Sequence, residues 1–182
     1  MGEHVLLLVS FFLVLGVSAV EKGRSYDVVV YGATPAGISA AVAAAHAGRN
    51  HVALIEPLGM IGGMGAAGGL ALHDQQMANL TMITGLAKRW ANYNSEYYNT
   101  SMLVNHPDMY VAEASFQRMI KEAKSIELFT SCRLTSATKM GPRVSAVGVL
   151  CNKKEQRIFA GKMFIDASYD GEIMVNAGGI DF

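Results

Sequence analysis

The chain has 182 residues, with 15 basic and 15 acidic side chains and therefore no formal net charge at neutral pH. Without a cationic surplus it has no electrostatic reason to bind nucleic acid or anionic lipid, and we predict neither as a partner. The histidines are scattered at spacings that match no metal site, so we predict no bound metal.

A hydrophobic leader occupies residues 5–20 and ends in Val17-Ser18-Ala19, where small residues suit a signal peptidase. It is shorter than the about 20 apolar residues of a membrane-spanning helix. We predict a cleaved signal peptide over residues 1–19, one domain over residues 20–182, and a location outside the cell or in the secretory-pathway lumen, without membrane attachment after cleavage. Because residues 1–4 contain no Lys or Arg, an uncleaved signal anchor is the alternative.

Residues 26–37 have the order of a nucleotide-binding crossover: a β-branched run, a glycine turn and an alanine-rich helix. Gly32 can adopt the dihedral angles of a tight turn. Pro35 suits the first helical turn because it has no N–H to leave unbonded, and Gly37 lets the helix lie close to the strand. The amino end of this helix would direct its free N–H groups and its positive dipole end at a diphosphate.

The next strand is predicted over residues 51–55 and ends at Glu56. Glu56 follows Gly37 by about 19 residues, the spacing at which an acid accepts hydrogen bonds from a ribose hydroxyl. A carboxylate there would repel a 2′-phosphate, so a free ribose is favoured over NADP. Thr34 replaces the middle glycine of the Gly-x-Gly-x-x-Gly pattern and brings a side chain towards the phosphates. An ordinary strand-turn-helix unit with accidental glycines is the alternative.

The loop over residues 57–69 is too rich in glycine to form a strand. Several exposed amides in an irregular loop can line an extended cofactor, which favours a flavin dinucleotide over NAD; a flexible surface loop is the alternative. The pair His73-Asp74 follows this loop, but such a pair is more often simply hydrogen-bonded. We therefore nominate no catalytic acid or base, and the catalytic residues are unknown.

The second half of the chain predicts two helices and then short strands. One helix spans about residues 82–98, and a second begins after Asp108 as its cap. Ala112, Phe116, Met119, Ile120 and Ala123 share the face of the second helix that we expect in the core. Strands are expected near residues 127–129, 134–139, 144–151, 157–160 and 162–165, the middle ones as an antiparallel meander, and a last helix near residues 171–177.

Two further features agree with an oxidising, extracytoplasmic location. Asn79-Leu-Thr81 and Asn99-Thr-Ser101 are N-glycosylation acceptor patterns, so we expect a glycoprotein if they are used. Cys132 and Cys151 are the two cysteines of the chain. A disulfide between them is conceivable across the meander, and two buried free thiols are the alternative.

Taken together, residues 32–38, Glu56, residues 61–64 and residues 164–171 resemble the FAD-dependent oxidoreductase family of the glutathione-reductase-type flavoprotein superfamily. Thr34-Pro-Ala-Gly37 is similar to the phosphate turn of a branch that includes bacterial proteins labelled xanthan lyase. The resemblance covers about residues 26–180 and is specific for FAD binding, but it says little about the substrate.

The resemblance implies an α/β fold, a Rossmann-like FAD-binding domain with a parallel sheet and an inserted antiparallel β-meander. It places the turn residues on the diphosphate, Glu56 on the adenosine ribose, the glycine loop near the ribityl chain or diphosphate, Leu134 near the adenine and Asp166 at the ribityl-diphosphate end. A turn or helix cap is the alternative role for Asp166. The implied FAD contacts are Gly32, Ala33, Thr34, Pro35, Ala36, Gly37, Glu56, Gly62, Gly63, Met64, Leu134 and Asp166.

The function implied is that of the FAD-binding portion of a secreted flavoprotein oxidoreductase, with hydride transfer from an unknown small-molecule or carbohydrate substrate to FAD. In the resembled family a substrate domain and a closing strand-helix unit follow the point where this sequence stops. We therefore expect a domain incomplete at its C-terminus and doubt catalysis by this chain alone. An NAD-dependent dehydrogenase and a non-catalytic dinucleotide-binding fragment are the alternatives, and the sequence predicts no oligomeric state.

Overall fold

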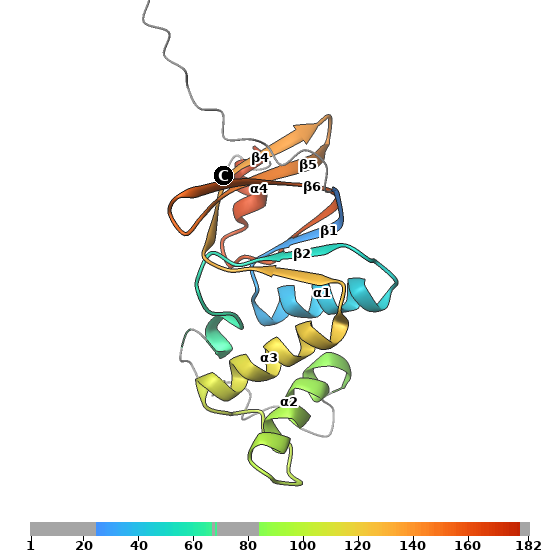
Figure 1. Cartoon of the computed structure of the whole chain (residues 1–182), viewed down its shortest axis with the longest axis vertical. Coiled ribbons are helices and arrows are strands. Elements are labelled where there is room, and N and C mark those ends of the chain that lie inside the picture. Colours follow the sequence, from blue (N-terminus) through green and yellow to red (C-terminus); the bar gives the residue numbers. More distant parts are fainter. Residues whose placement is uncertain (1–24, 67, 69–83, 179–182) are drawn as a thin grey trace, which may run out of the picture.

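A computed structural model describes residues 25–66, 68 and 84–178. Its strands form a single six-stranded sheet in the order β3-β2-β1-β6-β5-β4 (Figure 1). The strands are β1 (Ser25–Tyr31), β2 (Val52–Ile55), β3 (Ile126–Phe129), β4 (Cys132–Met140), β5 (Arg143–Cys151) and β6 (Glu155–Asp166). β1 pairs in parallel with both β2 and β6, and β2 pairs in parallel with β3. β4, β5 and β6 form the predicted antiparallel meander.

The helices are α1 (Pro35–His46), the short 3-10 helix η1 (Gly63–Gly65), α2 (Gly85–Tyr97), α3 (Met109–Ala123) and α4 (Glu172–Asn176). α1 and α3 lie on one side of the parallel strands, with α2 beyond α3, whereas α4 lies on the other side near β4 (Figure 1). No helix among the described residues is long and apolar enough to cross a membrane.

Each face of β1 and β2 is buried against a different layer, because alternate side chains of a strand point to opposite faces. Val28, Val30 and Leu54 pack towards the helices, where Ile38 of α1 and Phe116 of α3 meet them. The other face contacts the meander and α4 through Val29, Tyr31, Ala53, Ile55, Val147, Val149, Phe159 and Ile173. The predicted α/β class is therefore confirmed, and the parallel strands lie at its centre.

The predicted apolar face of the second helix is confirmed as part of the core. Ala112, Phe116, Met119 and Ile120 are buried, and Ala123 packs against them. One detail of this helix differs from the prediction. Asp108 is at the N-cap position of α3, but its side chain makes no capping hydrogen bond. Its carboxylate instead accepts a hydrogen bond from the hydroxyl of Tyr98 at 2.8 Å, so the predicted cap residue is confirmed but its side chain does not make the cap.

The last strand is longer than the sequence predicts. Residues 157–160 and 162–165 were expected to form separate strands, yet both belong to β6, which runs from Glu155 to Asp166. Its first half pairs antiparallel with β5, and its second half pairs in parallel with β1. Glycine is a weak strand former, but Gly161 pairs with Tyr26 of β1 and the strand continues through it. The predicted separation is therefore wrong. β6 thereby joins the meander to the parallel sheet.

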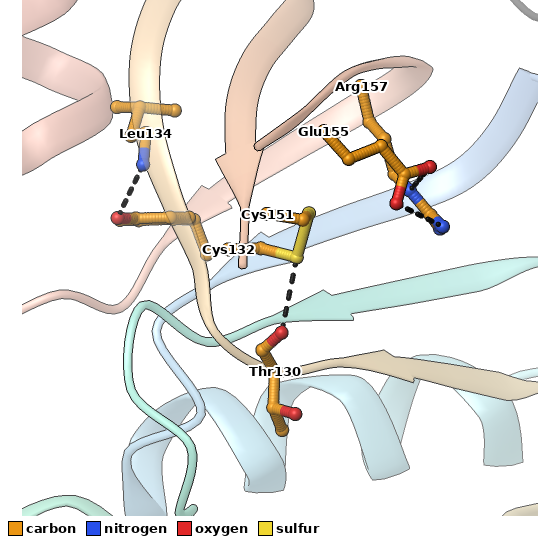
Figure 2. Close-up of a disulfide and its surroundings, with 7 residues drawn as sticks. Thr130, Cys132, Leu134, Cys151, Glu155 and Arg157 are labelled. Carbon is orange, nitrogen blue, oxygen red and sulfur yellow. Dashed lines mark hydrogen bonds and ion pairs between the residues drawn. A yellow bond between two sulfur atoms is a disulfide. The ribbon is translucent and has the colours of Figure 1, made fainter. Parts of the chain in front are cut away.

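The two cysteines form a disulfide between neighbouring strands (Figure 2). Cys132 at the start of β4 is directly opposite Cys151 at the end of β5. Both residues are buried, at 3% and 2% exposure, in the core under the meander. The disulfide alternative is therefore the one that the structure supports, over two free thiols. The bond closes the β4–β5 hairpin at its open end.

We predict that this disulfide stabilises the domain by restricting its unfolded chain. The two half-cystines are 19 residues apart, and closing a loop of this size is worth about 3 kcal/mol in the chain-entropy treatment. Urea unfolding of the oxidised protein should therefore give a free energy of unfolding about 3 kcal/mol above that of the same protein in dithiothreitol.

The control is the double variant Cys132→Ala/Cys151→Ala, whose unfolding midpoint should not respond to dithiothreitol. Identical midpoints for the native sequence with and without reductant would contradict a stabilising bond. Titration of thiols in the denatured, unreduced protein checks the pairing itself and should find none.

Candidate functional site

The turn between β1 and α1 leaves no room for side chains at two of its glycines. Gly32 has a φ of 94°, and a Cβ there would lie 2.8 Å from the backbone of Ala167 and Ser168. A Cβ on Gly37 would lie 1.9 Å from the carbonyl oxygen of Gly32. Real Cβ atoms do not approach backbone this closely, so both positions require glycine. The turn is consequently pressed between the first turn of α1 and the loop after β6.

Thr34 is the N-cap of α1, and its hydroxyl explains its presence in a glycine pattern. Oγ1 accepts a hydrogen bond from the amide of Gly37 at 3.2 Å and donates one to the carbonyl of Ala167 at 3.0 Å. The side chain is 6% exposed. An N-cap of this kind satisfies one of the amides that a helix leaves without an internal acceptor. The amide of Ala36 belongs to the same first turn, and Ala36 is exposed.

Glu56 follows β2 and lies beside this turn, with only 5% of its surface exposed. Its Oε2 accepts a hydrogen bond from the amide of Ala33 at 2.7 Å, and its Oε1 accepts one from Leu58 at 2.9 Å. Burial raises the pKa of Glu56; the two amides oppose this shift, and the charge of Glu172 adds to it. A carboxylate has about four lone-pair sites, so each oxygen retains an acceptor site for a ligand hydroxyl.

A cleft of about 210 Å³ lies at the carboxyl ends of β1, β2 and β6. Open parallel sheets bind their ligands in this place. Its walls come from the loops that follow the three strands, with Gly32, Thr34, Glu56, Pro57, Leu58, Met60, Gly63, Met64, Gly68, Ser168, Tyr169, Asp170 and Glu172 as the lining residues. Lys and Arg are absent from this lining within the described part of the chain. An anion here would have to be held by backbone amides and by the dipole of α1.

The structure brings together the larger part of the predicted cofactor contacts. Gly32, Thr34, Glu56, Gly63 and Met64 line the cleft. Ala33, Pro35, Ala36, Gly37 and Gly62 belong to the same turn and loop, and the amide of Gly62 donates to the carbonyl of Ala33 at 2.7 Å. Their contacts with a cofactor stay predictions, but their grouping around one cleft agrees with them.

Asp166 and Leu134 lie apart from the lining. The carboxylate of Asp166 accepts hydrogen bonds from the amide and hydroxyl of Ser168 at 3.2 and 2.6 Å, and from the amide of Met174 at 3.1 Å. These contacts match the alternative role of a turn and helix cap. A contact between Asp166 and FAD stays a prediction.

Leu134 is 8% exposed in the core below the meander. Its amide donates to the hydroxyl of Tyr31 at 3.0 Å, a bond drawn in Figure 2. Tyr31 donates in turn to Glu172 at 2.7 Å, and burial, followed by this carboxylate, raises the pKa of Tyr31. Leu134 therefore connects indirectly to the cleft, and its contact with adenine also stays a prediction.

Sequence reasoning did not assign roles to the four lining residues that follow β6, namely Ser168, Tyr169 and Asp170 of the loop and Glu172 at the start of α4. Ser168 and Tyr169 lie within residues 164–171, which carry part of the family resemblance, so the signal was present without a role. The hydroxyl of Tyr169 accepts a hydrogen bond from the amide of Met64 at 2.9 Å. His73 and Asp74 lie outside the described residues. Among those that are described, no cluster could hold a metal ion.

Solved structures with the same fold have low sequence identity to this chain. An aromatic hydroxylase from angucycline biosynthesis aligns with a TM-score of 0.55 and 17% identity over 87% of this chain and 34% of its own. Glycerol-3-phosphate dehydrogenase from Bacillus halodurans, complexed with FAD, aligns with a TM-score of 0.54 and 12% identity over 80% of this chain and 34% of its own. A geranylgeranyl bacteriochlorophyll reductase-like protein from Thermoplasma acidophilum aligns with a TM-score of 0.53 and 18% identity over 87% of this chain and 43% of its own.

At these identities the similarity establishes the fold alone, and the chain spans only 34% to 43% of the solved chains. A search of curated protein sequences finds no match. The family match is more informative: residues 27–180 match the sequence profile described as FAD dependent oxidoreductase. Membership of the branch labelled xanthan lyase stays a prediction. With this match over most of its length and an FAD-binding type of fold, the chain belongs to the FAD-dependent oxidoreductase family, whose cofactor is FAD.

Proposed function

We propose that this chain is the FAD-binding part of a secreted flavoprotein oxidoreductase that takes a hydride from a small-molecule or carbohydrate substrate. The observation that carries the proposal is the shared cleft of the α1 amino end and Glu56. Gly32 and Thr34, in the turn between β1 and α1, line the same cleft as the carboxylate at the end of β2. A diphosphate and the ribose next to it need an amide-rich helix end and a hydroxyl acceptor in this arrangement.

The described residues fit FAD by their chemistry. The positive end of the α1 dipole and the amides of its first turn, where Ala36 is an exposed residue, would bind the diphosphate. Glu56 would accept from the adenosine ribose hydroxyls with the lone pairs that Ala33 and Leu58 leave free. The chemistry that FAD supplies to an oxidoreductase is hydride acceptance. A ligand pocket for a whole drug-sized molecule has a volume of about 300–1,000 Å³, so this cleft of about 210 Å³ suits only the central part of the dinucleotide.

The acidic lining argues for the same type of ligand. Glu56, Asp170 and Glu172 all line the cleft. Glu56, at the proposed ribose position, would repel the extra 2′-phosphate of NADP, whereas ribose hydroxyls benefit from a carboxylate acceptor. The family match favours FAD over NAD.

Secretion is part of the proposal and rests on two observations. Residues 1–19 have the pattern of a signal peptide, although they lie outside the described residues. Cys132 and Cys151 form a buried disulfide, and such bonds persist in oxidising compartments such as the secretory route. Of the acceptor asparagines, Asn79 is outside the described residues, whereas Asn99 is exposed just after α2. We propose Asn99 as a glycosylated position.

Replacement of Glu56 should weaken FAD binding if this residue holds the adenosine ribose. Hydrogen bonds to a charged group are worth about 1.5–3 kcal/mol, so Glu56→Gln should raise the FAD dissociation constant about 10- to 100-fold. Titration of flavin fluorescence measures this change. The ADP constant, measured by competition, should rise by the same factor because ADP contains the same ribose.

The matched control is Glu155→Gln at the distant start of β6, which should bind FAD normally. Circular dichroism should confirm that each variant is folded. An unchanged FAD constant in Glu56→Gln, or a loss for FAD that ADP does not share, would count against the assigned contact.

FAD binding should also weaken on acidification. The hydroxyl acceptor is the ionised carboxylate, and burial raises the pKa of Glu56. Affinity should therefore fall as the pH decreases through this raised pKa, at a higher pH than an ordinary glutamate would give. Dissociation constants measured across the acidic range test this expectation. Glu56→Gln should show a flatter profile, and equal slopes in both proteins would disprove the link to this residue.

Expression in cells with an N-glycosylation pathway tests the secretory part of the proposal. The protein from the medium should begin after residue 19 and lose mass on treatment with peptide N-glycosidase. The shift assigned to Asn99 should vanish in Asn99→Gln and in Ser101→Ala, while Asn152→Gln, an exposed asparagine outside any acceptor pattern, should keep it. Retention of residues 1–19, or unmodified Asn99 in secreted protein, would refute the corresponding part.

A further inference from the structure

Tyr169 reaches from the loop after β6 to the glycine loop on the opposite wall of the cleft. Its hydroxyl oxygen accepts a hydrogen bond from the amide of Met64 at 2.9 Å. Both residues line the cleft. The tyrosine is nevertheless 61% exposed, so little packing holds its ring in this position. This hydrogen bond therefore connects two of the loops that line the cleft.

Gly63 shows how close the phenol comes to the amino end of α1. A Cβ on Gly63 would lie 2.3 Å from the hydroxyl oxygen of Tyr169 and 3.3 Å from Cδ of Pro35. Pro35 is the first residue of α1. The phenolic oxygen consequently lies in the region between the glycine loop and the helix end, where the proposed function places a diphosphate. Any side chain at residue 63 would exclude the phenol from it.

The amide of Met64 can donate one good hydrogen bond at a time, and the phenol takes it in this structure. A phosphate oxygen is a charged acceptor, and charge-assisted hydrogen bonds are roughly twice as strong as neutral ones. A bound diphosphate would therefore compete successfully for this amide. Because the backbone next to Tyr169 is held through Ser168 and Asp166, rotation of the exposed tyrosine side chain is sufficient to release it.

We propose that the hydroxyl of Tyr169 occupies the position of a phosphate oxygen on the Met64 amide and thereby sets the affinity of the cleft for a diphosphate. This inference rests on the proposed function, since it concerns the same cleft. Tyr169 is a positioning residue: it keeps the glycine loop in place through Met64 until the ligand replaces its hydroxyl. The diphosphate must then break this hydrogen bond in order to bind.

The deciding variant is Tyr169→Phe, which keeps the ring and removes the competing oxygen. Because a neutral hydrogen bond no longer has to be broken, FAD and ADP should each bind about 2- to 10-fold more tightly than to the native protein. Tyr97→Phe is the matched control, since it removes the hydroxyl of another exposed tyrosine at the far end of α2, and it should leave both dissociation constants unchanged.

Hydrogen exchange of the Met64 amide gives a readout that does not depend on turnover. Without ligand, this amide should exchange faster in Tyr169→Phe than in the native protein. Saturating FAD should slow it to a similar rate in both, because a phosphate oxygen now accepts the bond. Faster exchange that FAD does not restore in either protein would contradict the replacement.

The outcomes separate the inference from the function on which it rests. If the native protein binds FAD and Tyr169→Phe binds it equally or more weakly, the inference is overturned while the proposed function stands. If neither protein binds FAD or ADP, both fall. If only Tyr169→Phe binds them, the phenol is the barrier that we describe, and the inference is supported in its strongest form.

Discussion

The close backbone contact between the turn after β1 and the loop after β6 determines the shape of the site. β1 and β6 are parallel neighbours, so the chain leaves both strands at the same edge of the sheet and the two loops must share that space. They can do so only because Gly32 has no side chain, since a Cβ would lie 2.8 Å from Ala167 and Ser168. Thr34 then fixes the contact through its hydrogen bond to Ala167. One wall of the cleft is the direct result.

The described lining of the cleft contains carboxylates but no cationic side chain to balance them. The carboxylate of Glu56 is held by the amides of Ala33 and Leu58, which ties the end of β2 to the turn after β1. These bonds lower the pKa of Glu56, yet burial outweighs them. In such a site, the positions of the amides and carboxylates determine where a ligand's phosphate and hydroxyl groups can lie. It offers amides and a helix dipole at one point and carboxylate acceptors at another, which matches the alternation of phosphate and hydroxyl groups along a dinucleotide.

The sequence predicted the elements whose signals are local. The strand-glycine-helix order around Gly32, the acid at residue 56 and the apolar face of α3 are all found where they were expected. The sequence did not predict the features that depend on contacts between segments far apart in the chain. The union of residues 157–160 and 162–165 into β6 depends on pairing with strands far away in the sequence. The contact of Tyr169 with Met64 joins residues 105 positions apart, and no local pattern encodes it.

Thr34 shows why a departure from a motif need not mean loss of the site. A glycine at this position would leave the amide of Gly37 and the carbonyl of Ala167 without the hydroxyl that now bridges them. Threonine satisfies both from within the turn, and its side chain is directed at the protein because it is buried. The side chain of Thr34 is therefore bonded within the fold instead of extending into the cleft that this residue lines. The physical requirement at this turn is an unobstructed helix end, and threonine meets it by bonding its own side chain to the fold.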